Sequence, residues 1–138
     1  MPTMKKMTPI LLVEAIEPCL AFWIDRLGFQ KTAEVQDGDK LGFVILQKDG
    51  VEIMYQTRHS MERDVPALAN GPVKASAILY IEVEKLDPVI DKLAGFEFVV
   101  PKRRTFYGAS EIFVREPGGA VVAFSSHEEV EPALASPR

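Results

Sequence analysis

Residues 13–29 are repeated, with small changes, at residues 83–96. Both copies begin with the pattern V-E-x-[IL]-[ED]-P, seventy positions apart, and both end in a leucine followed, directly or after one alanine, by Gly-Phe. A second pair of similar segments, residues 49–55 and 118–124, follows in the same order at an offset of sixty-nine. Two pairs of similar segments that occur in the same order and at nearly the same offset predict two copies of a single supersecondary unit.

Each copy has the pattern of a strand, a helix and three further strands. An apolar, β-branched run precedes the helix, as is typical of a strand. The helix is expected to begin at Pro18 or Pro88, because the fixed φ and missing N–H of proline suit the first helical position. Gly28 or Gly95 is expected to end it in a left-handed conformation. The sequence therefore predicts a βαβββ unit that occurs twice.

The expected boundaries follow from hydrophobic periodicity and turn residues. We expect strands at residues 8–13, 29–35, 41–48, 51–56, 77–83, 96–100, 110–115 and 120–125, helices at 17–27 and 88–93, and a basic, aromatic loop at 102–108. The first module is thus expected at 8–56, a linker with one helical turn around 61–69 at 57–76, the second module at 77–127, and a disordered tail at 128–138.

Composition limits the kinds of partner. The 138 residues are 47% hydrophobic, enough for one substantial core or two small halves. A net charge of −4 argues against nucleic acid or an anionic membrane as the main partner. The one cysteine cannot form an intrachain disulfide, and no stretch approaches the roughly 20 apolar residues that span a bilayer. We expect a cytoplasmic protein.

Two motifs point to a known family. The helix end A-F-W-x-x-x-L-G-F at residues 21–29 and the hairpin F-V-R-E-P-G-G-A-V-V-A-F at residues 113–124 resemble the vicinal oxygen chelate superfamily. That superfamily includes glyoxalase I, extradiol dioxygenases, fosfomycin-resistance enzymes and bleomycin-resistance binding proteins. The resemblance, over residues 8–127, implies an α+β fold of two βαβββ modules that form curled mixed sheets around a cleft, with helices on the outer face. It also implies a homodimer.

The resemblance further implies four positions at which metal-dependent members carry His, Glu or Gln. They lie five residues before the valine that ends each copy's first strand and four residues after each hairpin glycine, and here they are Thr8, Met54, Ile78 and Ala123. Isoleucine and alanine offer no donor atom, and methionine suits only soft metals. We therefore expect neither a metal nor another cofactor. A displaced metal site made of Glu52, Glu111 and His127 remains an alternative.

Strand alternation, continued from these four positions, predicts the side chains that face the cleft. The expected ligand-binding residues are Thr8, Met54, Gln56, Ile78, Tyr80, Glu111, Phe113 and Ala123. Val44 and Leu46 are assigned to the same side. The opposite side, with Tyr55 and Phe124, is almost wholly apolar and is expected to pack against the helices.

Charged residues near this cleft leave two questions open. Glu111 lies among Ile, Phe and Val, so its carboxylate either pairs with a nearby cation such as Arg115 or serves a ligand. The basic run at residues 102–104 either contacts an anionic ligand at the cavity mouth or forms a solvated loop.

Apolar walls with a few polar groups suit an organic ligand. The leading hypothesis is a metal-free, homodimeric small-molecule binding protein, similar to the bleomycin-resistance type and without catalytic residues. One alternative is a metal-dependent lyase, isomerase or dioxygenase with displaced ligands. Another is a cofactor-free acid–base catalyst that uses Glu111. The sequence does not indicate which ligand is bound.

Overall fold

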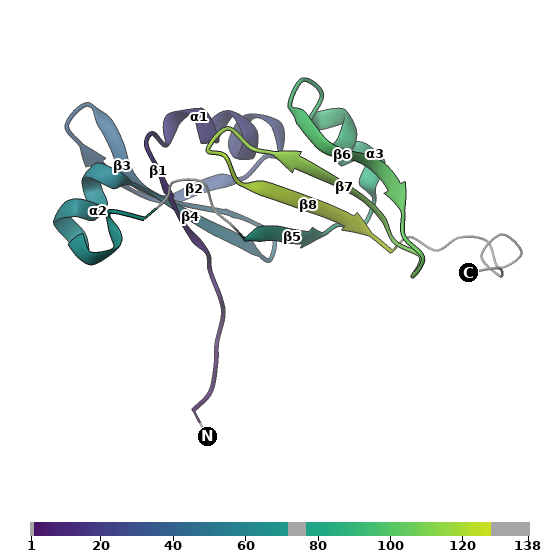
Figure 1. Ribbon diagram of the computed structural model, residues 1–138, viewed down its shortest axis with the longest axis horizontal. Coiled ribbons are helices and arrows are strands. Elements are labelled where there is room, and N and C mark those ends of the chain that lie inside the picture. Colours follow the sequence, from purple (N-terminus) through teal and green to yellow (C-terminus); the bar gives the residue numbers. More distant parts are fainter. Residues whose placement is uncertain (1, 72–76, 128–138) are drawn as a thin grey trace, which may run out of the picture. The chain divides into compact units, whose positions relative to one another are not determined.

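The computed structural model describes residues 2–71 and 77–127 (Figure 1). The chain divides into two compact units, Met1–Lys74 and Ala75–Arg138. Within the described residues each unit holds one four-stranded mixed sheet, and neither sheet closes into a barrel. This confirms the α+β architecture of two related modules. The expected tail at 128–138 lies outside the described residues.

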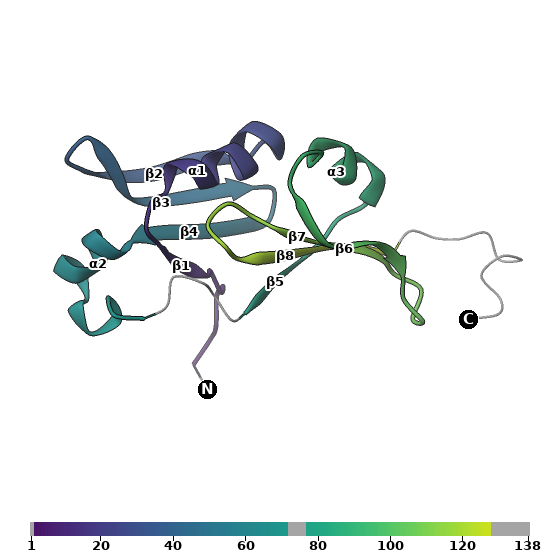
Figure 2. The same cartoon turned by 45° about the horizontal axis from the view of Figure 1, so that its top comes forward.

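The first unit has a sheet with strand order β1-β4-β3-β2 (Figure 2). Strand β1 is parallel to β4, and the other neighbours are antiparallel. The elements in chain order are β1 (Ile10–Val13), α1 (Glu17–Leu20), its continuation as the π-helix η1 (Ala21–Arg26), β2 (Gln30–Asp37), β3 (Lys40–Lys48), β4 (Val51–Thr57), α2 (Arg58–Asp64) and the 3-10 helix η2 (Pro66–Leu68). The segment expected to be a linker thus carries α2 and η2.

The second unit repeats this topology without a counterpart of α2 among its described residues. Its strand order is β5-β8-β7-β6, with β5 parallel to β8. The elements are β5 (Ile78–Glu82), α3 (Leu86–Lys92), β6 (Glu97–Arg104), β7 (Ser110–Arg115) and β8 (Val121–Ser126). Gly28 and Gly95 follow the helices of the two units with φ of 79° and 97°, so both end in the expected left-handed conformation.

The basic loop expected at residues 102–108 begins later than predicted. Strand β6 continues to Arg104, which pairs with Ser110 of β7. Pro101 lies inside β6, and a proline is tolerated there because β6 is an edge strand. The prediction stopped the strand at this proline, and the actual turn covers only the residues between Arg104 and Ser110.

The assignment of Val44 and Leu46 to the cleft side was wrong. The Asp49-Gly50 turn pairs Lys48 with Val51, and continuing that register puts Val44 opposite Tyr55 and Leu46 opposite Ile53. Side chains at directly opposite positions lie on the same face of a sheet. Val44 and Leu46 are therefore on the helix-covered face, where both are fully buried.

One hydrogen bond joins the helix of the first unit to its sheet. Trp23 of η1 donates its indole N–H to the Tyr55 hydroxyl of β4 over 2.8 Å. Both side chains are completely buried, and Trp23 also makes edge-to-face contacts with Phe22 and Phe29. Burial of this much aromatic surface is a main source of the unit's stability, and the bond satisfies a donor that would otherwise be desolvated.

A charged cluster fixes α2 to the end of β2. The Asp37 carboxylate contacts His59 Nδ1 at 2.6 Å and accepts a hydrogen bond from Arg63 Nη2 at 2.8 Å. These contacts, first that with His59 and then that with Arg63, hold the pKa of Asp37 below its ordinary value. Thr57 caps the start of α2 by accepting a hydrogen bond from the Ser60 backbone N–H.

We expect Tyr55→Phe to lower the free energy of unfolding by about 1–3 kcal/mol, because the buried Trp23 indole N–H loses its acceptor. The measurement is urea denaturation followed by far-ultraviolet circular dichroism. The matched control is Tyr107→Phe, which removes an exposed hydroxyl and should change stability by less than about 0.5 kcal/mol. Equal effects of the two variants would contradict the role given to this bond.

We expect the stabilising effect of Asp37 to depend on pH. Its pKa is lower in the folded than in the unfolded chain, so the stabilisation is present above the unfolded pKa and disappears as pH falls through the folded pKa. Asp37→Asn should therefore be less stable than the parent at pH 7, and the difference should narrow below about pH 4. Asp39→Asn, in the adjacent turn, is the control, and a pH-independent difference would refute the expectation.

Candidate functional site

The sheet of the first unit has one face that the helix α1–η1 does not cover. Register pairs Ile10 with Met54, Met54 with Ile45, and Gln56 with both Leu12 and Phe43. Val35 of β2 pairs with Phe43 and extends the same face. We call these residues the first open face: Ile10, Leu12, Val35, Phe43, Ile45, Met54 and Gln56. The predicted residues Met54 and Gln56 both belong to it.

A hollow of about 410 Å³ lies where this face meets α2. Val35 and Phe43 supply its apolar lining, and its polar residues are Gln56, Ser60, Arg63 and Asp64. Volumes of this size are typical of small-molecule pockets. The first open face therefore has a concave region that combines apolar surface with hydrogen-bonding and charged groups.

The side chains of this hollow are held in place by one another. Gln56 is buried, and its Nε2 donates to Ser60 Oγ and to Asp64 Oδ2, each over 3.1 Å. Gly42 of β3 allows α2 to approach closely, because a Cβ there would lie 3.2 Å from the Ser60 Cβ and 3.0 Å from the Asp37 Cβ. A polar edge fixed in this way is preorganised for a ligand.

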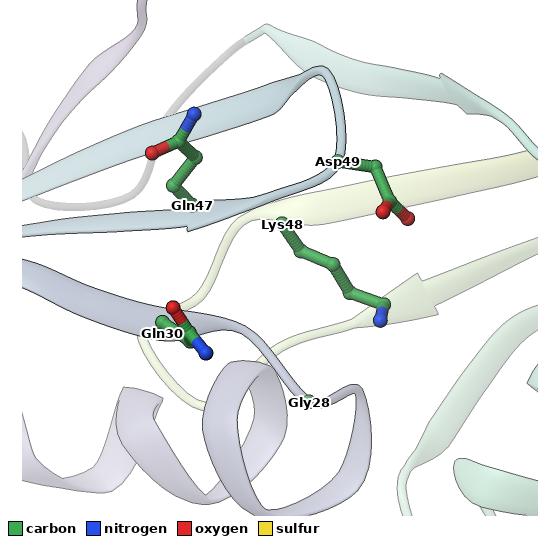
Figure 3. Close-up of a pocket in the computed structure, with 5 residues that line it drawn as sticks. All are labelled: Gly28, Gln30, Gln47, Lys48 and Asp49. Carbon is green, nitrogen blue, oxygen red and sulfur yellow. The ribbon is translucent and has the colours of Figure 1, made fainter.

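A second hollow, of about 270 Å³, lies at the other end of the first unit (Figure 3). It is lined by Gly28, Gln30, Gln47, Lys48 and Asp49. Figure 3 shows Lys48 and Asp49 projecting from the β3–β4 turn, with the two glutamines on β2 and β3. It has no apolar wall and contains none of the predicted site residues, so it is the poorer candidate for an organic ligand.

Thr8, also predicted for the site, lies before β1 and is engaged in a polar contact. Its hydroxyl donates to Glu52 Oε1 over 2.8 Å, and Lys6 Nζ lies 2.8 Å from the same oxygen. The contacts from Lys6 and then Thr8 hold the pKa of Glu52 below its ordinary value. Neither Thr8 nor Glu52 is therefore a free ligand.

The second unit has an open face of its own, on the side opposite α3. Register places four side chains in one row across the sheet, in the order Val100, Phe113, Ala123 and Tyr80. A parallel row contains Arg103, Glu111, Ser125 and Glu82, and Ile78 lies beside Val121. We call these residues the second open face. It contains all five of the predicted residues that belong to this unit.

Glu111 pairs with a cation, but the cation is Arg103 and not Arg115. Arg103 donates from Nε over 2.9 Å and from Nη2 over 2.6 Å to the single oxygen Glu111 Oε1. Arg115 instead lies 3.4 Å from Glu97. The Arg103 guanidinium also lies over the Phe113 ring, 5.5 Å from its centre.

Two buried polar atoms beside this pair have no hydrogen-bond partner in the described part of the chain. They are Glu111 Oε2 and Ser125 Oγ, which belong to directly opposite residues of β7 and β8. Unsatisfied buried groups are rare because each costs free energy, and they often mark sites of function. The second open face thus contains polar groups whose bonding capacity is not fully used.

The metal positions of the superfamily do not fit a metal in this chain. Thr8 donates its hydroxyl to Glu52, Met54 offers a thioether, and Ile78 and Ala123 have no donor atoms. Across residues 2–71 and 77–127, no three His, Cys, Asp or Glu side chains are grouped so that they could hold an ion. In the displaced set, Glu52 contacts Lys6, Glu111 contacts Arg103, and His127 lies 3.7 Å from Glu82.

Sequence reasoning missed two parts of these sites. One is the set of α2 side chains Ser60, Arg63 and Asp64, which lie in the segment predicted to be a linker. Thr57, a favoured N-cap residue, was the sequence signal for the start of α2. The other is Arg103, whose strand position depends on an irregular register that no sequence pattern specifies.

No helix among the described residues is long and apolar enough to cross a membrane.

Comparisons with solved structures support the fold. A glyoxalase/bleomycin resistance protein/dioxygenase from Nocardioides matches with a TM-score of 0.70 and 20% identity, over 94% of this chain and 87% of that one. The bleomycin-binding protein from bleomycin-producing Streptomyces verticillus, solved with copper(II)-bleomycin, matches with a TM-score of 0.62 and 20% identity, over 93% and 100%. A bleomycin resistance determinant encoded on the transposon TN5 matches with a TM-score of 0.63 and 17% identity, over 92% and 100%.

Comparison with curated protein sequences gives no match. A family model, however, matches residues 7–124, and its description is the glyoxalase/bleomycin resistance protein/dioxygenase superfamily. The matched range includes the whole first open face and all of the second open face except Ser125. This chain belongs to the glyoxalase/bleomycin resistance protein/dioxygenase superfamily.

Proposed function

We propose that this chain is a metal-free small-molecule binding protein of the glyoxalase/bleomycin-resistance type, which holds an organic ligand on the open faces of its sheets. The observation that carries the proposal is the hollow beside Gln56. Its apolar lining from Val35 and Phe43 suits a hydrocarbon or aromatic group, and its fixed polar edge suits a few directional hydrogen bonds.

The donor set supports binding over metal-dependent catalysis. A lyase or dioxygenase of the vicinal oxygen chelate type needs a divalent ion to polarise its substrate. Thr8, Met54, Ile78 and Ala123 together offer one hydroxyl and one thioether, which is too little for a hard or borderline cation. The structural relatives add support, because a protein of this fold has been solved with copper(II)-bleomycin, an organic ligand that brings its own metal.

The proposal includes a cytoplasmic homodimer. Ile10, Val35, Ile78 and Tyr80 are large, exposed and apolar or aromatic, and all lie on the open faces. Exposed apolar surface of this kind is typical of contacts with a ligand or another chain. Cys19 is buried and forms no disulfide, which agrees with a reducing compartment.

We expect Val35→Arg to abolish binding of neutral aromatic probes at the hollow beside Gln56. Val35 is 57% exposed, so the larger side chain fills the hollow without disturbing the core. The measurement is the change in the NMR signals of the Gln56 side-chain amide and of α2 on titration with indole or naphthalene-2-carboxamide. Val99→Arg, at a 40% exposed valine of edge strand β6, is the matched control and should bind as the parent does.

We expect protein purified without added metal to contain no stoichiometric Zn, Ni, Mn or Fe, because its four superfamily positions lack suitable donors. Elemental analysis by mass spectrometry provides the measurement, and probe binding should be unchanged by EDTA. A stoichiometric ion removed by EDTA together with probe binding would instead favour a metal-dependent enzyme with displaced ligands.

A further inference from the structure

We propose that the second open face contains an anion subsite in which Arg103 receives the carboxylate of an organic ligand. The inference rests on the proposed binding function and specifies the chemical class of the ligand: an apolar or aromatic carboxylic acid. It depends on the bonding of Arg103, its burial relative to Glu111, the strand irregularity that places it, and the apolar row beside it.

The bonding of Arg103 leaves one edge of its guanidinium unused. Of the five N–H groups, one on Nε and one on Nη2 point to Glu111 Oε1. Nη1 forms no hydrogen bond with a described residue, so three N–H groups remain. The Nη1–Nη2 edge is the edge that forms two parallel hydrogen bonds with a carboxylate.

Glu111 and Arg103 differ in burial: the buried Glu111 holds Arg103, and the exposed Arg103 is available to a ligand. The Glu111 side chain is only 2% exposed, whereas that of Arg103 is 55% exposed. Two hydrogen bonds to the buried carboxylate and the contact with the Phe113 ring hold the guanidinium in place. Arg103 is therefore oriented before a ligand arrives, and binding costs less conformational entropy than with a free arginine.

An irregularity in β6 brings Arg103 to this face. Val100 pairs with Phe113 and Arg103 with Glu111, although regular alternation would put residues 100 and 103 on opposite faces. The register shift falls between them, at Pro101 and Lys102. Such bulges are often found next to binding sites, where they redirect a side chain.

The row beside Arg103 suits the apolar part of the ligand. Val100 and Phe113 lie next to each other in this row, and both are partly exposed. Tyr80, at the other end of the row, is 53% exposed, whereas Ala123 between Phe113 and Tyr80 is fully buried. A flat hydrocarbon or aromatic group that packs on Val100 and Phe113 has its carboxylate within one row of Arg103.

The charges around Arg103 are compatible with an anion. Lys102 pairs with Asp87 over 2.9 Å, and Glu111 neutralises Arg103 itself. Arg104 forms no ion pair with a described residue, which leaves this end of β6 with a net positive charge. Glu82, the remaining acid of the polar row, lies on β5, three strands away or about 14 Å.

The test uses matched probes on the full chain. Naphthalene-2-carboxylate, its neutral carboxamide and 2-naphthylmethylamine share one ring system and differ in charge. Their affinities are measured by isothermal calorimetry, and NMR shifts at Tyr80, Phe113 and Ala123 report binding at the second open face. The carboxylate is expected to bind there about tenfold more tightly than the amide, as a bidentate charge-assisted pair would require.

Two variants separate charge from geometry. Arg103→Lys keeps the partner of Glu111 but loses the guanidinium fork, so carboxylate affinity should fall about fivefold or more while amide affinity stays the same. Arg104→Lys, at the next residue of the strand, is the control and should change neither. If Arg103→Lys fails to fold, the double variant Arg103→Gln/Glu111→Gln keeps a neutral hydrogen-bonded pair and should abolish the preference for the carboxylate.

Three results would overturn the inference: equal affinity for carboxylate and amide, loss of both affinities together in Arg103→Lys, or probe shifts confined to the hollow beside Gln56. In each of these cases the protein still binds an organic molecule, so the proposed function stands. Failure of every probe to bind either open face would count against the proposed function as well.

Discussion

In the described part of the chain, α1–η1 and α3 each cover one face of their sheet, and α2 meets the opposite face of the first sheet only beside Gln56. This one-sided burial determines which side chains remain available to a ligand. In the first unit the Trp23–Tyr55 hydrogen bond attaches the helix to one face of the sheet. Because strand side chains alternate, the residues between the buried ones necessarily face away from the helix. The open faces are thus a direct consequence of how the cores are built, and both contain polar groups held by charged or hydrogen-bonded neighbours.

The sequence allowed the repeated architecture to be predicted because the features that define it are local. The prolines in the first turn of each helix, the left-handed Gly28 and Gly95, and the Asp49-Gly50 turn each act over a few residues, although α3 begins at Leu86, two residues before the predicted Pro88. The assignment of Val44 and Leu46 failed because alternation was continued from strands that carry a superfamily position, and β3 carries none. Its face is determined by the two-residue turn, which places Leu46 opposite Ile53.

The sites could be predicted only in part. Alternation from Met54 and Ala123 correctly grouped side chains of β4, β5, β7 and β8 by face, since those strands pair without a register shift. The edge strands β2 and β6 contain register shifts. Strand alternation therefore could not predict that Arg103 lies on the same face as Glu111. The α2 side of the first hollow was missed because a short helix after a strand has a weaker periodic signal than a long one.

The chain has one tryptophan, and its position has a practical consequence for spectroscopy. Trp23 is fully buried in the first unit, against Phe22, Phe29 and Tyr55. Its emission therefore reports the solvent exposure of that unit's core alone. Denaturation curves from indole fluorescence would follow the N-terminal half, and only a probe that averages over the backbone would also register the C-terminal half.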